Sequence, residues 1–153
     1  MKHRSPILAV GITVVFAIAT LFLTRPSTGA SSAMSPVSGL MSLKAMARES
    51  VPYAVAIADE KPTLLEFYAD WCTSCQALAP SLQKLHDEYG DRVDFVALDI
   101  DDPQWREQVA TFKATGVPQL TFLDRSGSAI DTIVGKVPAS ILDRAIQRLL
   151  QPT

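Results

Sequence analysis

From residue 60 onward, the hydrophobic positions follow two distinct patterns in turn. Residues Thr63 to Ala69 form a nearly continuous apolar run after Lys61-Pro62, which predicts a strand buried on both faces. The next apolar positions, 78, 82, 85 and 89, recur every three or four residues and stop before Gly90. This spacing predicts one face of a long helix that follows the strand.

The same alternation continues to the C-terminus. Three further strands are predicted, at 93–98, 119–123 and 129–134. Two further helices are predicted: one at 102–113, which opens at Asp102-Pro103, and a final one that opens at Pro138. A short amphipathic helix is also expected at 40–49. The order predicts an α/β fold with a central mixed sheet flanked by helices, in which a terminal hairpin adds an antiparallel edge.

The N-terminus carries a long apolar segment. No Lys, Arg, Asp or Glu lies between Arg4 and Arg25, and the 18 residues of 6–23 would span roughly 27 Å as a helix, close to the hydrocarbon thickness. Because signal-peptide cores are usually shorter, about 7–15 residues, we expect one N-terminal transmembrane helix. A cleaved signal stays open, since Ser31-Ser32-Ala33 also fits a cleavage site.

These patterns divide the chain into three parts. Residues 1–24 are expected to be the membrane anchor (or signal peptide), 25–50 a linker that includes the short helix, and 51–153 the globular domain. Residues 25–39 are rich in Ser, Thr, Gly, Pro and Ala, which favours a flexible tether, although a disordered segment with no spacing role fits equally. Lys2 and Arg4 favour a cytoplasmic N-terminus, with the domain across the membrane.

Charge excludes one class of partner. From residue 51 onward the chain has 15 acidic and 9 basic residues. A nucleic-acid binder normally shows a basic face. We therefore expect no nucleic-acid partner.

The only two cysteines, Cys72 and Cys75, lie three positions apart in the sequence ADWCTSC. They could form a structural staple, part of a metal site, or a redox pair. A structural staple is disfavoured, because a disulfide that closes so short a loop removes little chain entropy. A zinc site is disfavoured, because zinc needs four ligands and the only histidines are His3 and His86. The redox pair is therefore favoured, and no metal or other cofactor is expected.

The position of Cys72 favours it as the nucleophile. It lies where the first predicted strand ends and the long helix begins, and the unpaired N–H groups of a first helical turn stabilise a thiolate. In Cys-X-X-Cys settings the thiol pKa falls from about 8.5 toward about 3.5–7.5. Cys75 lies on the same helix face, so the pair can close a disulfide.

A longer stretch carries a family resemblance. The sequence EFYADWCTSC at 66–75, with Pro80 downstream and Val117-Pro118 before a strand, strongly resembles the thioredoxin superfamily over residues 61–151. With the tether and the apolar segment, it is most similar to the membrane-anchored thioredoxin-like proteins of thylakoids (TxlA type), and also to the C-terminal domain of DsbD. The resemblance implies a thioredoxin fold and protein-disulfide reductase activity.

The resemblance also implies roles for four further residues. Pro118 matches the family's cis-proline, and the backbone of Val117 before it would pair with a bound peptide. Trp71 would shield the thiols and contact substrate; alternatively, it is only a large apolar residue at a strand end. Glu66 matches the buried carboxylate, usually Asp, that takes the proton from Cys75; the alternative is an exposed edge position.

Two departures from the family pattern bear on the chemistry. Thr73-Ser74 stands where thioredoxins carry Gly-Pro, and Ala97 stands where they carry a lysine in the second strand. A proton relay through that lysine is therefore not expected, and neither is use as a general cytosolic thioredoxin.

The expected function is a membrane-tethered reductase that faces the thylakoid lumen or the periplasm. The resemblance implies protein disulfides as clients, apocytochromes among them, and a membrane thiol donor of the CcdA type. A disulfide oxidase or isomerase, and a non-enzymatic thioredoxin-like binding module, remain alternatives.

Overall fold

The computed structural model describes residues 36–151 of the chain, so the predicted membrane segment and most of the predicted tether lie outside the described residues. The helices are α2 (Pro36–Glu49), α3 (Tyr53–Ala58), α4 (Thr73–Tyr89), α5 (Arg106–Thr111) and α6 (Ala139–Leu149), and the strands are β1 (Thr63–Tyr68), β2 (Asp94–Asp99), β3 (Gln119–Leu123) and β4 (Ala129–Val134). None of the helices within 36–151 has the length and apolarity that a bilayer crossing requires.

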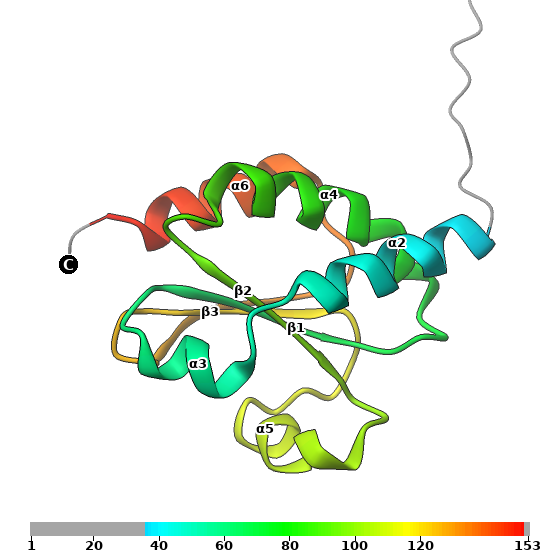
Figure 1. The fold of residues 1–153 in the computed structure, drawn as a ribbon, viewed down its shortest axis with the longest axis horizontal. Coiled ribbons are helices and arrows are strands. Elements are labelled where there is room, and N and C mark those ends of the chain that lie inside the picture. The colour runs from blue at the N-terminus through cyan, green and yellow to red at the C-terminus, as the bar shows by residue number, and fades with distance from the viewer. Residues whose placement is uncertain (1–35, 152–153) are drawn as a thin grey trace, which may run out of the picture. The chain divides into compact units, whose positions relative to one another are not determined.

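The four strands form one mixed sheet in the order β2-β1-β3-β4 (Figure 1). β2 runs parallel to β1, whereas β3 is antiparallel to β1 and β4 is antiparallel to β3. All six residues of the central strand β1 are buried, which explains its nearly continuous apolar run. β4 forms an edge, and most of its residues are exposed.

Helices cover both faces of the sheet, as predicted (Figure 1). On one face, α2, α4 and α6 contribute Leu43, Leu78 and Leu142 to a hydrophobic core that also contains both cysteines. On the other face, α3 and α5 pack over a second core that contains Leu65 and Phe67 of β1. Alternate residues of β1 therefore serve different cores, as the period of a strand requires.

α2 begins earlier than the sequence pattern predicts. It starts at Pro36 rather than near residue 40, so residues 36–39 belong to this helix and not to the predicted tether. Leu43 and Met46 of α2 are buried in the core beneath α4. The helix at the end of the predicted linker therefore packs as part of the folded unit.

The sequence pattern does not predict α3. Its six residues, YAVAIA, lack a helical hydrophobic spacing, and Pro52 before it provides no side-chain cap. So short a helix is marginal by itself. Packing stabilises it, because Ala56 is buried in the second core.

The predicted helix at 102–113 is divided into two parts. The side chain of Asp102 accepts a hydrogen bond from the backbone N–H of Gln104 over 3.0 Å, which caps a 3₁₀ turn at Pro103–Trp105. α5 follows directly and ends before Lys113, whose φ is 51°. Such 3₁₀ turns are frequent at helix N-termini.

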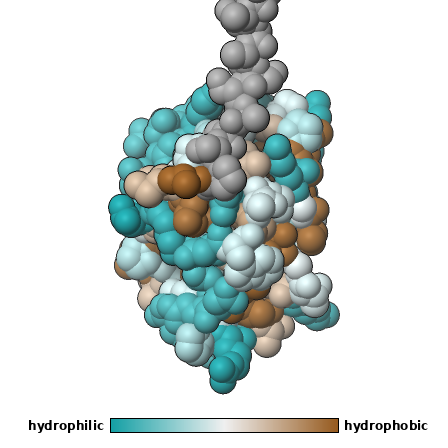
Figure 2. Space-filling view, turned by 90° about the vertical axis from the view of Figure 1, so that its right-hand side faces the viewer, coloured by the Kyte–Doolittle hydropathy of each residue, from teal (hydrophilic) through white to brown (hydrophobic). Residues whose placement is uncertain are grey.

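The face drawn in Figure 2 is mostly hydrophilic, with separate hydrophobic residues between the polar ones. Large apolar side chains with substantial exposure among the described residues are Val37, Met41, Val55, Ile57, Trp71, Ile130 and Val134. Of these, Trp71 directly precedes the first cysteine.

Candidate active site at the start of helix α4

The two cysteines lie at the junction of β1 and α4. Cys72 is the N-cap residue of α4, with φ −77° and ψ 101°, and its Sγ accepts a hydrogen bond from the backbone N–H of Cys75 over 3.1 Å. The two Cα atoms are 5.3 Å apart and the side chains form a disulfide. The Cys72 sulfur therefore lies at the end of the helix where unpaired N–H groups favour negative charge.

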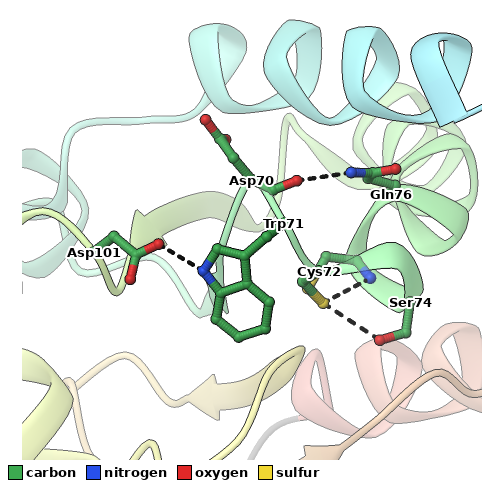
Figure 3. The surroundings of a disulfide bond; sticks show 7 residues. Asp70, Trp71, Cys72, Ser74, Gln76 and Asp101 are labelled. Carbon is green, nitrogen blue, oxygen red and sulfur yellow. Dashed lines mark hydrogen bonds between the residues drawn. A yellow bond between two sulfur atoms is a disulfide. The ribbon is translucent and has the colours of Figure 1, made fainter.

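The two sulfurs differ in their surroundings. Cys72 keeps 4% of its surface exposed, whereas Cys75 is fully buried. The hydroxyl of Ser74 lies 3.3 Å from the Cys72 Sγ (Figure 3). Once the pair is reduced, the Ser74 hydroxyl and the Cys75 N–H can both donate to a Cys72 thiolate. This arrangement favours Cys72 over Cys75 as the attacking sulfur.

Three polar contacts fix the loop before the cysteines, and Figure 3 shows two of them, Asp70–Gln76 and Trp71–Asp101. The carbonyl of Asp70 accepts a hydrogen bond from Gln76 Nε2 over 2.7 Å, and the Asp70 carboxylate forms an ion pair of 2.6 Å with Lys44 of α2. The indole Nε1 of Trp71 donates to Asp101 Oδ2 over 2.7 Å. Trp71 is thus held in one orientation although it is 63% exposed.

The Val117-Pro118 peptide bond is cis, as predicted. Pro118 is buried directly before β3, and its carbonyl accepts a hydrogen bond from Gly135 N–H over 2.7 Å. Gly135 has a φ of 89°, which glycine adopts without strain. Val117 packs against the core that contains both cysteines. A peptide-docking role for these residues and Trp71 stays a prediction.

Glu66 is buried in the middle of β1, where it pairs with Ala97 of β2 and Leu120 of β3. It is 2% exposed, and within residues 36–151 neither of its carboxyl oxygens has a hydrogen-bond partner. Burial raises its pKa from 4.5 to about 8. By strand alternation its side chain lies on the same face as Leu64 and Tyr68, which belong to the core that contains the cysteines. The exposed-edge alternative for Glu66 is therefore wrong.

The neighbouring Tyr68 responds to the same surroundings. Burial, together with nearby carboxylates that include Asp99, Asp70 and Glu66, raises its pKa to about 12. Its phenol therefore stays protonated at neutral pH.

His86 does not form part of a metal site in the described chain. Its ring contacts Phe95 edge-on, with the ring centroids 5.2 Å apart. Between residues 36 and 151, no group of three or more His, Cys, Asp or Glu side chains is placed to hold a metal ion.

The structure adds residues that sequence reasoning missed: Lys44, Asp70, Ser74, Gln76 and Asp101. Ser74 and Gln76 stand beside the cysteines in the sequence, so their proximity was a signal that could have been used. Lys44 and Asp101 come from distant segments. Only the tertiary fold brings them to the loop.

The family assignment follows from comparison with known proteins. A family profile described as "Thioredoxin" matches residues 44–148, which is more than half of the chain. The chain belongs to the thioredoxin family. The placement of Cys72, Cys75 and the cis Val117-Pro118 bond agrees with the family resemblance of the sequence.

Comparison with individual proteins shows which members of the family this chain is similar to. The chain is 42% identical over 114 residues to "Thiol:disulfide interchange protein TxlA" of Synechococcus elongatus, covering 74% of this chain and 60% of that protein. It is 35% identical over 138 residues to "Thioredoxin-like protein HCF164, chloroplastic" of Arabidopsis thaliana, covering 90% of this chain and 49% of that protein. The chain thus spans about half to three fifths of the length of these relatives.

Solved structures support the thioredoxin fold. A single-site variant of thioredoxin from Halobacterium salinarum NRC-1 superposes with a TM-score of 0.57 at 23% identity, covering 68% of this chain and 89% of that one. By sequence comparison, thioredoxin of Bacillus subtilis is 32% identical over 95 residues, covering 62% of this chain and 88% of that protein.

Proposed function

We propose that this chain is a protein-disulfide reductase in which Cys72 attacks and Cys75 resolves. The Cys72 thiolate attacks a client disulfide, forms a mixed disulfide and releases one client thiolate. The Cys75 sulfur then bonds to the Cys72 sulfur, and the second client thiolate leaves with the electron pair of the broken bond. The client is reduced by two electrons and the Cys72-Cys75 pair is oxidised. The capping position of Cys72 on α4 is the observation that carries this proposal.

Glu66 is the proposed base for the second step. Cys75 must lose its proton before it attacks, and a base works best when its pKa lies near the working pH. Burial brings the pKa of Glu66 to about 8, which meets that condition. Glu66 also faces the side of the sheet that α4 covers, and Cys75 of α4 belongs to the core on that side.

Trp71, Val117 and Pro118 are proposed to dock the client. Trp71 offers an exposed apolar face beside Cys72, and Asp101 holds its indole in place. Val117 stands before a cis-proline at the start of β3, where the family resemblance implies that its backbone pairs with the client peptide.

We further propose that the reductase is tethered by its N-terminal segment and faces the thylakoid lumen or the periplasm. The uncharged 18-residue segment at 6–23 and the similarity to TxlA and to chloroplastic HCF164 support this location. Apocytochromes are the proposed clients. A membrane thiol carrier of the CcdA type is the proposed electron donor.

Oxidases and isomerases of this family often insert a helical subdomain. Between β2 and β3 this chain has only the 3₁₀ turn and the six-residue α5. This short connection favours the reductase over those alternatives.

The direct experiment is reduction of a disulfide-bonded peptide by the full, pre-reduced chain, followed by mass spectrometry. We expect stoichiometric peptide reduction by the wild type and none by Cys72→Ser. Peptide that stays oxidised in the presence of the reduced wild type would contradict the reductase. Slow alkylation of Cys72 by a small reagent would instead favour the non-enzymatic module.

A further inference from the structure

A small cavity adjoins Glu66 on the side of the sheet that α2 and α4 cover. Its volume is about 20 Å³. A cavity needs about 10–15 Å³ to hold one water molecule, so this one has room for one. The lining includes Glu66, Ala97, Ser50, His86 and Glu49. The cavity is therefore bordered both by the buried Glu66 carboxyl and by exposed Glu49 at the end of α2.

Apolar side chains form much of the lining, and the polar groups among them, Glu66 and Ser50, have unused hydrogen-bonding capacity. Both oxygens of Glu66 are without a protein partner among the described residues. The Ser50 hydroxyl accepts from Ala97 N–H over 2.7 Å and donates to the Val51 carbonyl over 3.3 Å. A hydroxyl oxygen accepts two hydrogen bonds, so one further bond remains open at Ser50.

Two features of this chain border the cavity. Ala97, opposite Glu66 in the β1–β2 register, has only a methyl group where thioredoxins carry a lysine. α2 then covers the space with Met46, Glu49 and the adjoining Ser50. The route from Glu66 to solvent is therefore bordered by α2 and not by a lysine of the sheet.

We propose that this cavity is the proton-exchange route of Glu66, in which one water molecule links the buried carboxyl to Ser50 and to the outer groups His86 and Glu49. The proposal rests on the proposed function and adds the path by which the proton leaves. Cys75 gives its proton to Glu66 as the mixed disulfide is resolved. Glu66 then passes it to the water, and the water passes a proton outward. The same water solvates the Glu66 carboxylate and so helps it to ionise.

Few ionisable groups of the described chain surround Glu66. α4 contributes Cys75 and His86, α2 contributes Glu49, and β1 contributes Tyr68. The strand partners Ala97 and Leu120 carry no charge. Water in the cavity is therefore the main source of solvation for the Glu66 carboxylate.

The test follows the two steps separately in the full chain. The reduced protein is mixed with a nitrobenzoate disulfide, which releases one coloured thiolate when Cys72 attacks and a second when Cys75 resolves. Ala97→Leu fills the cavity. Ala97→Ser is the matched control, because it changes the same position but leaves room for the water.

We expect Ala97→Leu to slow the second release about tenfold at neutral pH. The pH at which the rate of this release is half-maximal, its pH midpoint, should rise by about one unit, because loss of the water desolvates the carboxylate. The first release should change less than about twofold, since it needs no proton from Cys75. Ala97→Ser should follow the wild type. A second release in Ala97→Leu with wild-type rate and midpoint would overturn the proposal.

Ser50→Ala gives a second test if Ala97→Leu fails to fold by circular dichroism. It removes the hydroxyl that orients the water, and Ser42→Ala on α2 is its control. We expect Ser50→Ala to move the midpoint upward and Ser42→Ala to leave it in place. A wild-type midpoint in folded Ser50→Ala would overturn the route. No first release from the wild type would instead contradict the proposed reductase chemistry.

Discussion

At the scale of single residues, Glu66 links protonation to stability. Burial raises its pKa from 4.5 to about 8. Between these two values the folded chain keeps a proton on Glu66 that the unfolded chain has released. The free energy of unfolding therefore falls as the pH rises from about 4.5 to about 8, because the folded state must then ionise a buried carboxyl.

Glu66→Gln should remove this pH dependence. We expect the stability of the oxidised wild type, relative to the variant, to fall by on the order of 4 kcal/mol from acid to alkaline pH. Urea unfolding of both proteins across that range provides the measurement. Parallel stability curves would show that Glu66 titrates as an exposed carboxyl does.

Cys72 and Cys75 should behave differently when each is replaced by serine. Cys75→Ser keeps the sulfur that caps α4 and removes the resolving thiol, so mixed disulfides should accumulate on Cys72. Cys72→Ser should give none, because its remaining thiol is fully buried. The adducts are isolated from native membranes, released with dithiothreitol and identified by mass spectrometry. Equal amounts of mixed disulfide on the two variants would contradict the assignment of Cys72 as the attacking cysteine and Cys75 as the resolving one.

At the scale of elements, α2 packs on α4 and also contacts the loop of the site. Its buried face packs beneath α4 through Leu43 and Met46, and its Lys44 forms the ion pair with Asp70 in the loop before the cysteines. Both partners of that pair are more than one third exposed, so the ion pair contributes little stability by itself. The apolar face of α2 is therefore what fixes it to the domain.

Leu43→Ala tests whether α2 is part of the cooperative fold. Leu43 is fully buried, and a leucine-to-alanine change in a core costs about 2–5 kcal/mol. We expect a loss in that range by urea denaturation. Met41→Ala on the same helix is the control, because Met41 is 62% exposed, and it should change stability by less than about 0.5 kcal/mol. Similar values for the two variants would place α2 outside the folded unit.

The sequence predicted best the elements with strong local patterns. β3 and β4 have the predicted bounds, and the run at 63–69 corresponds to β1 within one residue. α3 was not predicted because the packing of Ala56 in the second core, and not local periodicity, stabilises it. The first turn of α2 was not predicted because residues 36–39, PVSG, have a composition typical of a tether.

The site was predictable where residues adjoin in sequence or match the family motif, as with Cys72, Cys75 and Pro118. The Lys44–Asp70 ion pair, the Trp71–Asp101 hydrogen bond and the cavity beside Glu66 could not be predicted. Each joins segments that only the fold brings together.

At the scale of the whole molecule, the proposed orientation places the catalytic domain outside the cytoplasm. Lys2 and Arg4 precede the apolar segment, and Arg25 is the only Lys or Arg in residues 5–43. Protease added to sealed, right-side-out vesicles should therefore degrade the domain, while a cytoplasmic marker protein stays intact. Full protection of the domain from the protease would contradict the proposed orientation.

The reduction potential of the Cys72-Cys75 pair decides whether the pair works as a reductant. The full chain is equilibrated against a dithiothreitol series, and the reduced fraction is counted by thiol alkylation and mass spectrometry. We predict a value near that of thioredoxin, about −270 mV. A value near that of the oxidant DsbA, about −120 mV, would show that the pair is an oxidant and not a reductant.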